Sequence, residues 1–299
     1  MGRGFSDPVA AAPEPPVRAV SAGLRRLFVV AGGLVVIVGS SLFFASEQTD
    51  RNFAWTIATP LTAAFLGAAY LAAAVFEWTT ATERVWARAR VSVSAVLVFT
   101  VLTLIATLLH LDRFHFGPEH RFITRLGTWL WTFIYVVVPL VMVLLLLRQR
   151  RAPGADPPRA QPLPSWLRAV FAAQAAVLLA VGAAMFAVPT DVQWLWPWPI
   201  TALTGRAIAA WLLGIGVGMV HAFVENDLGR IRVAGVSNVA IALLQFVALA
   251  RYPGDVTSGP KATLYVLYLA SMLAVGVYVL AAGRRPRPGP AGVPATSYG

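Results

Sequence analysis

The sequence predicts an all-α, polytopic membrane protein with eight transmembrane helices arranged as two parallel four-helix repeats. Three observations lead to this fold class. Apolar residues make up 58% of the chain and charged residues only 12%, about half of the roughly 25% found in average soluble domains. The apolar residues form eight runs of about 20 residues, the length at which a helix spans the hydrocarbon core of a bilayer. Short patterns of polar residues in and beside the first four runs recur about 142 positions later, in and beside the last four.

Each of the eight runs is apolar on every side for five or more turns. A membrane β-barrel needs short strands of alternating polarity, so helices are the remaining structure that satisfies its own backbone in lipid. The runs are Leu27 to Ala45, Trp55 to Phe76, Val91 to Leu111, Leu126 to Leu147, Leu167 to Val188, Leu203 to Phe223, Val233 to Ala250 and Ala262 to Ala282.

The distribution of Lys and Arg predicts the orientation, because positive charge is retained on the cytoplasmic side during insertion. With the N-terminus inside, the inner segments hold Arg3, Arg18, Arg25, Arg26, Arg84, Arg88, Arg90, Arg148, Arg150, Arg151, Arg159, Arg168, Arg230, Arg232, Arg284, Arg285 and Arg287. The outer segments hold only Arg51, Arg113, Arg121, Arg125, Arg206, Arg251 and Lys261. We therefore expect a multi-pass protein of the bacterial plasma membrane with both termini in the cytoplasm.

The internal repeat depends on two polar patterns. A Glu-x4-Arg-x-Arg pattern begins at Glu83 and again at Glu225, and a Thr-x-Leu-Thr pattern begins at Thr59 and again at Thr201. Because four helices per copy is an even number, the copies would share one orientation and be related by an axis along the membrane normal.

This repeat sets the expected domain boundaries. Residues 23–151 form the first repeat and residues 165–283 the second. Between them, residues 152–164 are rich in proline and predict a cytoplasmic linker. Residues 1–22 and 284–299 have no apolar period, so we expect a disordered cytoplasmic tail at the start and a cytoplasmic tail at the end.

Acidic and basic residues meet in two of the predicted inner loops. We consider a cytoplasmic gate in which acid and base pair across the two halves in one conformation only. The alternative is that these arginines only set the topology and each carboxylate is satisfied locally. The residues concerned are Glu83, Arg88, Arg90, Glu225, Asp227, Arg230 and Arg232.

Neutral polar residues interrupt the apolar runs of the second half at Gln174, Asn238 and Gln245. Asn238 and Gln245 are seven positions apart and share a helix face. They predict either hydrogen bonds that join helices, worth about 0.6 to 2 kcal/mol each, or a small polar pocket within the second bundle.

The outer loop between the third and fourth runs combines three imidazoles and two carboxylates, which are ligand types that suit Zn²⁺ or Cu²⁺. The alternative is that these histidines lie at the membrane surface without a ligand. The residues are His110, Asp112, His115, Glu119 and His120. We expect no other cofactor, and the absence of cysteine excludes thiolate ligands and disulfides.

Three functions fit these features. The first is a non-catalytic scaffold, accessory or lipid-contacting protein, because there is no nucleotide loop or nucleophile motif and no ionisable residue in the middle of a run. The second is a carrier for a small neutral or lipophilic solute, and the third an extracytoplasmic metalloenzyme. Membrane lipid is the expected partner, and a second copy of the chain or another membrane protein is a further candidate. A G-x-x-x-G at Gly214 and Gly218 predicts close packing inside the chain or a homo-oligomer contact, and no basic face suits a nucleic acid.

Overall fold

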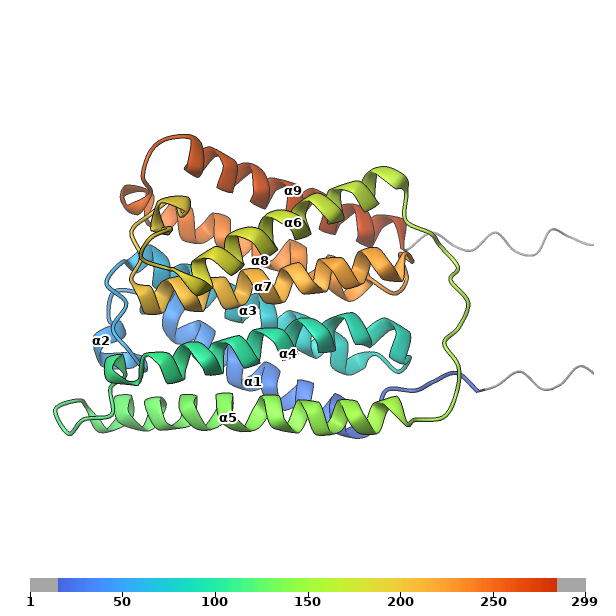
Figure 1. Cartoon of the computed structure of the whole chain (residues 1–299), viewed down its shortest axis with the longest axis horizontal. Helices are drawn as coiled ribbons and strands as arrows, with labels where there is room; N and C mark the ends of the chain where they lie inside the picture. Colours follow the sequence, from blue (N-terminus) through green and yellow to red (C-terminus); the bar gives the residue numbers. More distant parts are fainter. Residues whose placement is uncertain (1–15, 284–299) are drawn as a thin grey trace, which may run out of the picture.

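The computed structural model describes residues 16–283, which form a bundle of eight long helices lying side by side (Figure 1). Each long helix is long and apolar enough to cross a membrane, so the predicted all-α fold with eight spanning helices is confirmed. The protein is a multi-pass membrane protein. Most of the predicted N-terminal tail, 1–15, and the tail 284–299 lie outside the described residues. The long helices are α1 (Ala22–Phe44), α3 (Pro60–Thr82), α4 (Trp86–Leu109), α5 (Phe122–Arg150), α6 (Ser165–Ala187), α7 (Ala202–Glu225), α8 (Arg232–Arg251) and α9 (Pro260–Ala282).

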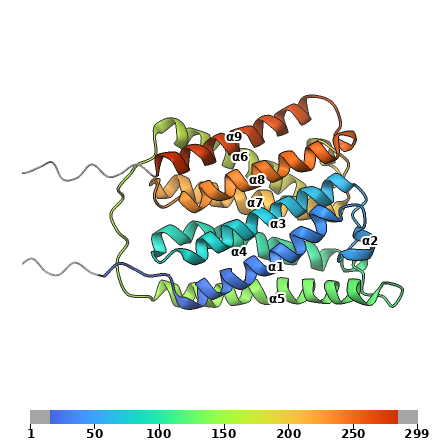
Figure 2. The ribbon, with the colours of Figure 1, turned by 180° about the vertical axis from the view of Figure 1, so that it is seen from behind.

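Successive long helices run in opposite directions, so the bundle has two distinct ends (Figures 1 and 2). Residues 151–164 cross one end, where α5 ends and α6 begins, and we call it the linker end. The opposite end, which we call the loop end, carries the short helix α2 (Thr49–Asn52) and the longer connections.

The helix boundaries follow from residues that suit helix ends. Pro60 and Pro260 occupy the first turns of α3 and α9, where the missing N–H of proline costs no hydrogen bond. Thr201 and Thr204 form a reciprocal capping box at the start of α7. Asn226 ends α7 in the left-handed conformation with φ 47°, which asparagine tolerates better than most residues.

Four helices form the centre of the bundle, and four lie outside them. Among the central helices, α3 packs against α8 and α4 packs against α7. In the most apolar stretch of α3, 72% of residues are buried, against 22% in the peripheral helix α5. Gly67 of α3 approaches α1 so closely that a Cβ atom there would lie 2.4 Å from the backbone nitrogen of Phe43. Small residues therefore bring the helices together.

The helix contacts come in matched pairs. Helix α1 packs on α3 and α6 packs on α7, while α5 packs on α4 and α9 packs on α8. These are the correspondences that a repeat relating α1, α3, α4 and α5 to α6, α7, α8 and α9 would require. The repeat itself stays a prediction.

Residues 152–164, which we call the strap, contain no helix but are held at many points. The backbone of Ala155 pairs with Pro16 and Arg18, with both hydrogen bonds at 2.9 Å. The carbonyl of Gln161 accepts from the amide of Leu228, also at 2.9 Å. The expected linker is therefore a fixed segment that lies across the linker end and touches both halves of the bundle.

Candidate functional site

Glu77 is an ionisable side chain that lies inside the bundle, away from the charged residues at its two ends. Helix α3 begins at Pro60 and continues to Thr82, so it includes Glu77, whose side chain is only 4% exposed. Glu77 lies five residues before the end of α3, at a depth of about 8 Å along the helix axis. The prediction that no ionisable residue occupies the middle of an apolar run did not cover Glu77, which follows the predicted run by one residue and is nevertheless buried.

The burial of Glu77 was not predicted, because the polar threonines that follow it are typical of the end of an apolar run. The hydroxyls of Thr79 and Thr80 donate to the carbonyls of Val75 and Phe76, at 2.6 and 2.7 Å. Threonines that bond four residues back are satisfied within the helix. Because a threonine can donate its hydroxyl to a carbonyl of its own helix, these threonines are compatible with a helix that continues past Glu77.

The carboxyl of Glu77 lacks a partner. Its Oε2 atom is buried and has no hydrogen-bond partner among the described residues, and the ion pairs found in residues 16–283 do not involve it. Burying an unpaired charge costs several kcal/mol. Ionisable groups at membrane depth that persist despite this cost are usually functional.

Glu77 faces a cavity of about 80 Å³ between the four central helices. Asn238 and Ser237 of α8 line the same cavity, together with the rings of Phe99 and Trp211. We call it the central cavity. It presents one carboxyl, one amide and one hydroxyl in an otherwise apolar and aromatic lining, a pattern typical of small-molecule sites.

The three residues of the predicted polar pocket do not gather. Asn238 lines the central cavity, whereas the Gln245 amide donates to the Phe65 carbonyl at 3.0 Å and joins α8 to α3. The Gln174 amide donates to the hydroxyl of Ser271 at 2.9 Å and joins α6 to α9. Two of the three thus act as contacts between helices, and the third shares a cavity with a carboxyl of the other half.

A larger cavity of about 360 Å³ extends from the loop end toward the middle of the bundle, between α3, α6, α7, α8 and α9. We call it the loop-end cavity. Two of its lining groups, the Trp196 indole N–H and the Tyr268 hydroxyl, are buried without a hydrogen-bond partner in the described part of the chain. Lys261, the only lysine of the chain, lies beside them and donates to the Trp196 carbonyl at 3.3 Å.

The two cavities are neighbours. Trp211, Ile215 and Met272 line both of them. A few side chains therefore separate the central cavity from a space that reaches the loop end.

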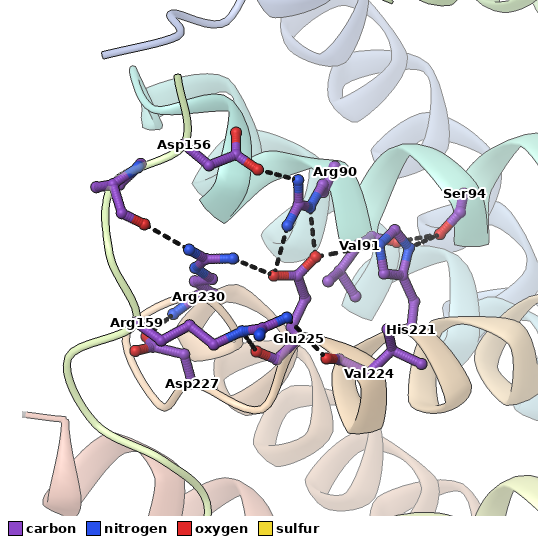
Figure 3. Close-up of polar contacts among 11 residues, drawn as sticks. Arg90, Val91, Ser94, Asp156, Arg159, His221, Val224, Glu225, Asp227 and Arg230 are labelled. Carbon is purple, nitrogen blue, oxygen red and sulfur yellow. Dashed lines mark hydrogen bonds and ion pairs between the residues drawn. The ribbon is translucent and has the colours of Figure 1, made fainter. Parts of the chain in front are cut away.

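At the linker end, Glu225 is the centre of a charged network that joins α7 to α4 (Figure 3). Arg90 of α4 binds both carboxylate oxygens of Glu225 through Nε and Nη2, the latter at 2.8 Å. Arg230 donates to Oε2 at 2.7 Å, and His221 lies 3.4 Å from Oε1. Glu225 is only 2% exposed, so these contacts supply the charge compensation that its burial requires.

The strap completes this network (Figure 3). Asp156 pairs with Arg90, and Arg159 donates to the backbone carbonyl of Glu225 at 2.8 Å. Asp227 accepts from two strap amides, those of Ala160 at 2.6 Å and Gln161 at 3.0 Å. Three carboxylates and three guanidinium groups thus balance in charge across α4, α7 and the strap.

The network lies at one end of the central cavity. Ala222 and Gly218 of α7 line the cavity, and Glu225 follows Ala222 by one turn on the same face. On α4, Val91 lines the cavity directly after Arg90.

Of the residues predicted to form the gate, the structure brings together Arg90, Glu225, Asp227 and Arg230. Arg88 and Arg232 are exposed, and Glu83 is half-buried at the end of α3. These last three form no ion pair within residues 16–283.

The predicted metal ligands at the loop end are engaged with protein groups. His115 is buried; its Nδ1 lies 2.9 Å from the Phe53 carbonyl and its Nε2 3.0 Å from the Thr56 hydroxyl. The Nε2 of His110 accepts from the Arg206 guanidinium at 2.8 Å. Burial lowers the pKa of both histidines, and the Arg206 charge adds to the effect at His110.

The ring of His120 lies against that of His115, with ring centroids 4.1 Å apart. Asp112 pairs with the adjacent Arg113 at 3.0 Å, and Glu119 lies 3.4 Å from His120. Within the described residues, no three His, Asp or Glu side chains are placed to share one ion. The geometry therefore gives no support to the metalloenzyme interpretation.

The chain matches no protein-family model, no curated protein and no solved structure.

Proposed function

We propose that the protein is a carrier that moves a small, largely apolar solute across the membrane, and that the central cavity is its binding site. The observation that carries this proposal is the carboxyl of Glu77, buried without a partner and facing a cavity inside the bundle. A bundle that serves only as a scaffold gains nothing from an unpaired acid at this depth, because the acid lowers stability.

The arrangement of the cavities supports a site that is approached from one end at a time. The loop-end cavity leads toward the central cavity and shares Trp211, Ile215 and Met272 with it. At the other end, the Glu225 network covers the route to the linker end. Alternating access requires this asymmetry, with one route short and the other closed.

In this proposal, the pairs from Glu225 to Arg90 and Arg230 are the gate. They join α4 of the first half to α7 and the following loop of the second half. If the halves move relative to each other, these pairs must separate, and the charged groups then gain water in place of their partners. Opening the gate therefore costs free energy, because the ion pairs are lost, but hydration of the separated charges offsets part of that cost.

The cavities also support two parallel halves. Asn52, Phe53 and Ala54 line a cavity of about 160 Å³ between α1 and α5. The residues 142 positions later, Trp194, Leu195 and Trp196, line the loop-end cavity of the second half. Equivalent cavities in the two halves are what parallel repeats around a shared site would produce.

The excess of arginine at the linker end favours the cytoplasm for that side. With this orientation in a plasma membrane, the structure is the carrier state whose closed gate faces the cytoplasm. Solute would then reach the central cavity from the outer face.

The proposal is tested by measuring a distance across the linker end. The chain has no cysteine, so spin labels can be attached at Arg88→Cys and Arg232→Cys, two exposed positions at the starts of α4 and α8. In lipid nanodiscs, a carrier predicts two distance populations by double electron–electron resonance. Adding Glu225→Gln should shift the ratio toward the longer distance, because a neutral amide holds the two arginines less strongly.

A non-catalytic scaffold is the second candidate, favoured by the strap, which ties both halves together through Asp156, Arg159 and Asp227. A scaffold predicts one narrow distance distribution that Glu225→Gln leaves in place. That result would overturn the carrier proposal.

A further inference from the structure

We infer that Glu77 is a proton-binding site and that protons reach it from the loop end past Tyr135. The inference deepens the proposed function, because it makes the carrier proton-coupled. The proton site shares with the carrier proposal the buried carboxyl of Glu77, and it adds observations on α1, α3, α4 and α5 that the carrier proposal does not use.

Glu77 faces a second cavity in addition to the central one. This cavity, of about 40 Å³, lies between α1, α3, α4 and α5 and is lined by Glu77, Thr100 and Tyr135 among apolar side chains. It has room for two or three water molecules at about 15 Å³ each, and its three polar groups can hold them. The Thr100 hydroxyl donates to the Val96 carbonyl at 2.9 Å and keeps its lone pairs free to accept.

Tyr135 connects this small cavity to the loop end. The same residue lines the cavity of about 160 Å³ between α1 and α5, which extends to Ser41 and Asn52 at the loop end. Its hydroxyl lies 2.7 Å from the hydroxyl of Tyr70, and both side chains are buried. A pair of hydroxyls between two spaces that can hold water is the arrangement through which a proton can pass by exchange of hydrogen bonds.

No fixed positive charge competes for the Glu77 carboxylate. Tyr135 and Tyr70 are the titratable groups near it from α5 and α3, and the residues of α1, α4, α7 and α8 that line its two cavities carry no charge in the described chain. Arg25 at the start of α1 donates to the Ala81 carbonyl at 2.9 Å, and Arg90 of α4 is bound to Glu225. The counter-ion available to Glu77 is therefore a proton or a bound solute.

The chemistry of the site then follows. In the dry state, one carboxylate oxygen takes up a proton from water, which forms the neutral acid and removes the cost of a buried charge. When the central cavity admits water or a solute that donates a hydrogen bond, the carboxylate is stabilised and the proton returns to water. One proton is then bound and released in each cycle, and its release depends on what occupies the cavity.

The proton site is tested by infrared spectroscopy of the purified full-length protein in nanodiscs near neutral pH. We expect the C=O stretch of a protonated carboxyl in the native protein, its loss in Glu77→Gln, and a displaced band in Glu77→Asp, which keeps the acid. Glu83→Gln, a change of the same kind at the end of α3, should leave the band in place. A spectrum without this band, or a band that survives in Glu77→Gln, would overturn the proton site.

The route is tested by the rate at which the same band shifts after transfer to D₂O. Tyr135→Phe removes one hydroxyl without changing the ring, so we expect exchange at Glu77 to slow by an order of magnitude or more. Tyr268→Phe, which removes a hydroxyl in the loop-end cavity, serves as the matched control and should not change the rate. Equal rates in the three proteins would refute the route past Tyr135.

The two proposals can fail separately. A protonated Glu77 band together with a single linker-end distance would retain the proton site and refute the carrier. Two distance populations without a Glu77 band would retain the carrier and refute proton coupling.

Discussion

Removing the Glu225 side chain tests the charged network at the linker end. In Glu225→Ala, Arg90 and Arg230 lose the carboxylate to which both donate. Breaking a buried ion pair by removing one partner costs about 3 to 5 kcal/mol. Arg90 is 22% exposed and keeps Asp156, and Arg230 keeps the Pro157 carbonyl at 2.6 Å, so the lower value applies. We expect a loss of about 3 kcal/mol.

The assay is thermal unfolding of the purified protein in one detergent. For a chain of this size, 1 kcal/mol corresponds to about 2 to 4 °C, so Glu225→Ala should lower Tm by about 6 to 12 °C. Glu83→Ala is the matched control, because Glu83 occupies the equivalent position of the Glu-x4-Arg-x-Arg pattern but forms no ion pair within the described chain. Its Tm should change by no more than about 1 to 2 °C, given the small effects of surface substitutions. Equal shifts in the two variants would refute the reasoning.

Two further predictions concern packing and pH. Gly67→Ala should lower stability by about 1 to 3 kcal/mol, because the added methyl group meets the backbone of Phe43, which no side-chain rotation can relieve. Gly33→Ala, with open space at the same kind of position on α1, should instead raise stability by up to about 1 kcal/mol through helix propensity; equal effects in thermal unfolding would contradict the close approach of α1 and α3. The lowered pKa of His110 means that the unfolded chain takes up a proton first as the pH falls below roughly 6.5. Stability should therefore decline as the pH falls below about 6.5, and His110→Gln should reduce this decline; an unchanged pH profile of Tm would show that His110 does not contribute.

The fold could be predicted from the sequence because the bilayer imposes a length and a composition on each helix. The exact helix ends could not. Residues Trp55 to Phe76 form the second apolar run, but Pro60 starts the helix and the threonines extend it to Thr82. That shift of about one and a half turns at each end placed Glu77 outside the predicted span.

Only some residues of the candidate site could be predicted from the sequence. Asn238 interrupts an apolar run and was predicted either to join helices or to line a polar pocket. Glu77, which lines the same cavity, belongs to the other half, and no spacing rule links positions 161 residues apart. For the gate, the repeated Glu-x4-Arg-x-Arg pattern identified Arg90, Glu225 and Arg230. It could not show that the two copies differ, with Glu225 buried and Glu83 half-buried without an ion pair.

The strap and the histidine cluster show two further limits. Proline predicts irregular backbone but not where that backbone lies, so the contacts from Asp156 and Arg159 to the Glu225 network were not foreseen. In the loop after α4, closeness in sequence suggested a shared ligand. Both nitrogens of His115 instead form hydrogen bonds with Phe53 and Thr56, in the connection between α1 and α3. These bonds stabilise the loop end.

In the proposed carrier, the central cavity opens to the linker end only when the pairs from Glu225 to Arg90 and Arg230 separate. The most direct measurement is the reactivity of a single cysteine at Asn238→Cys toward a small, membrane-impermeant methanethiosulfonate added from the linker side of oriented vesicles. With the native Glu225, we expect slow reaction; with Glu225→Gln added, we expect reaction at least tenfold faster. Equal rates in the two proteins would contradict the account.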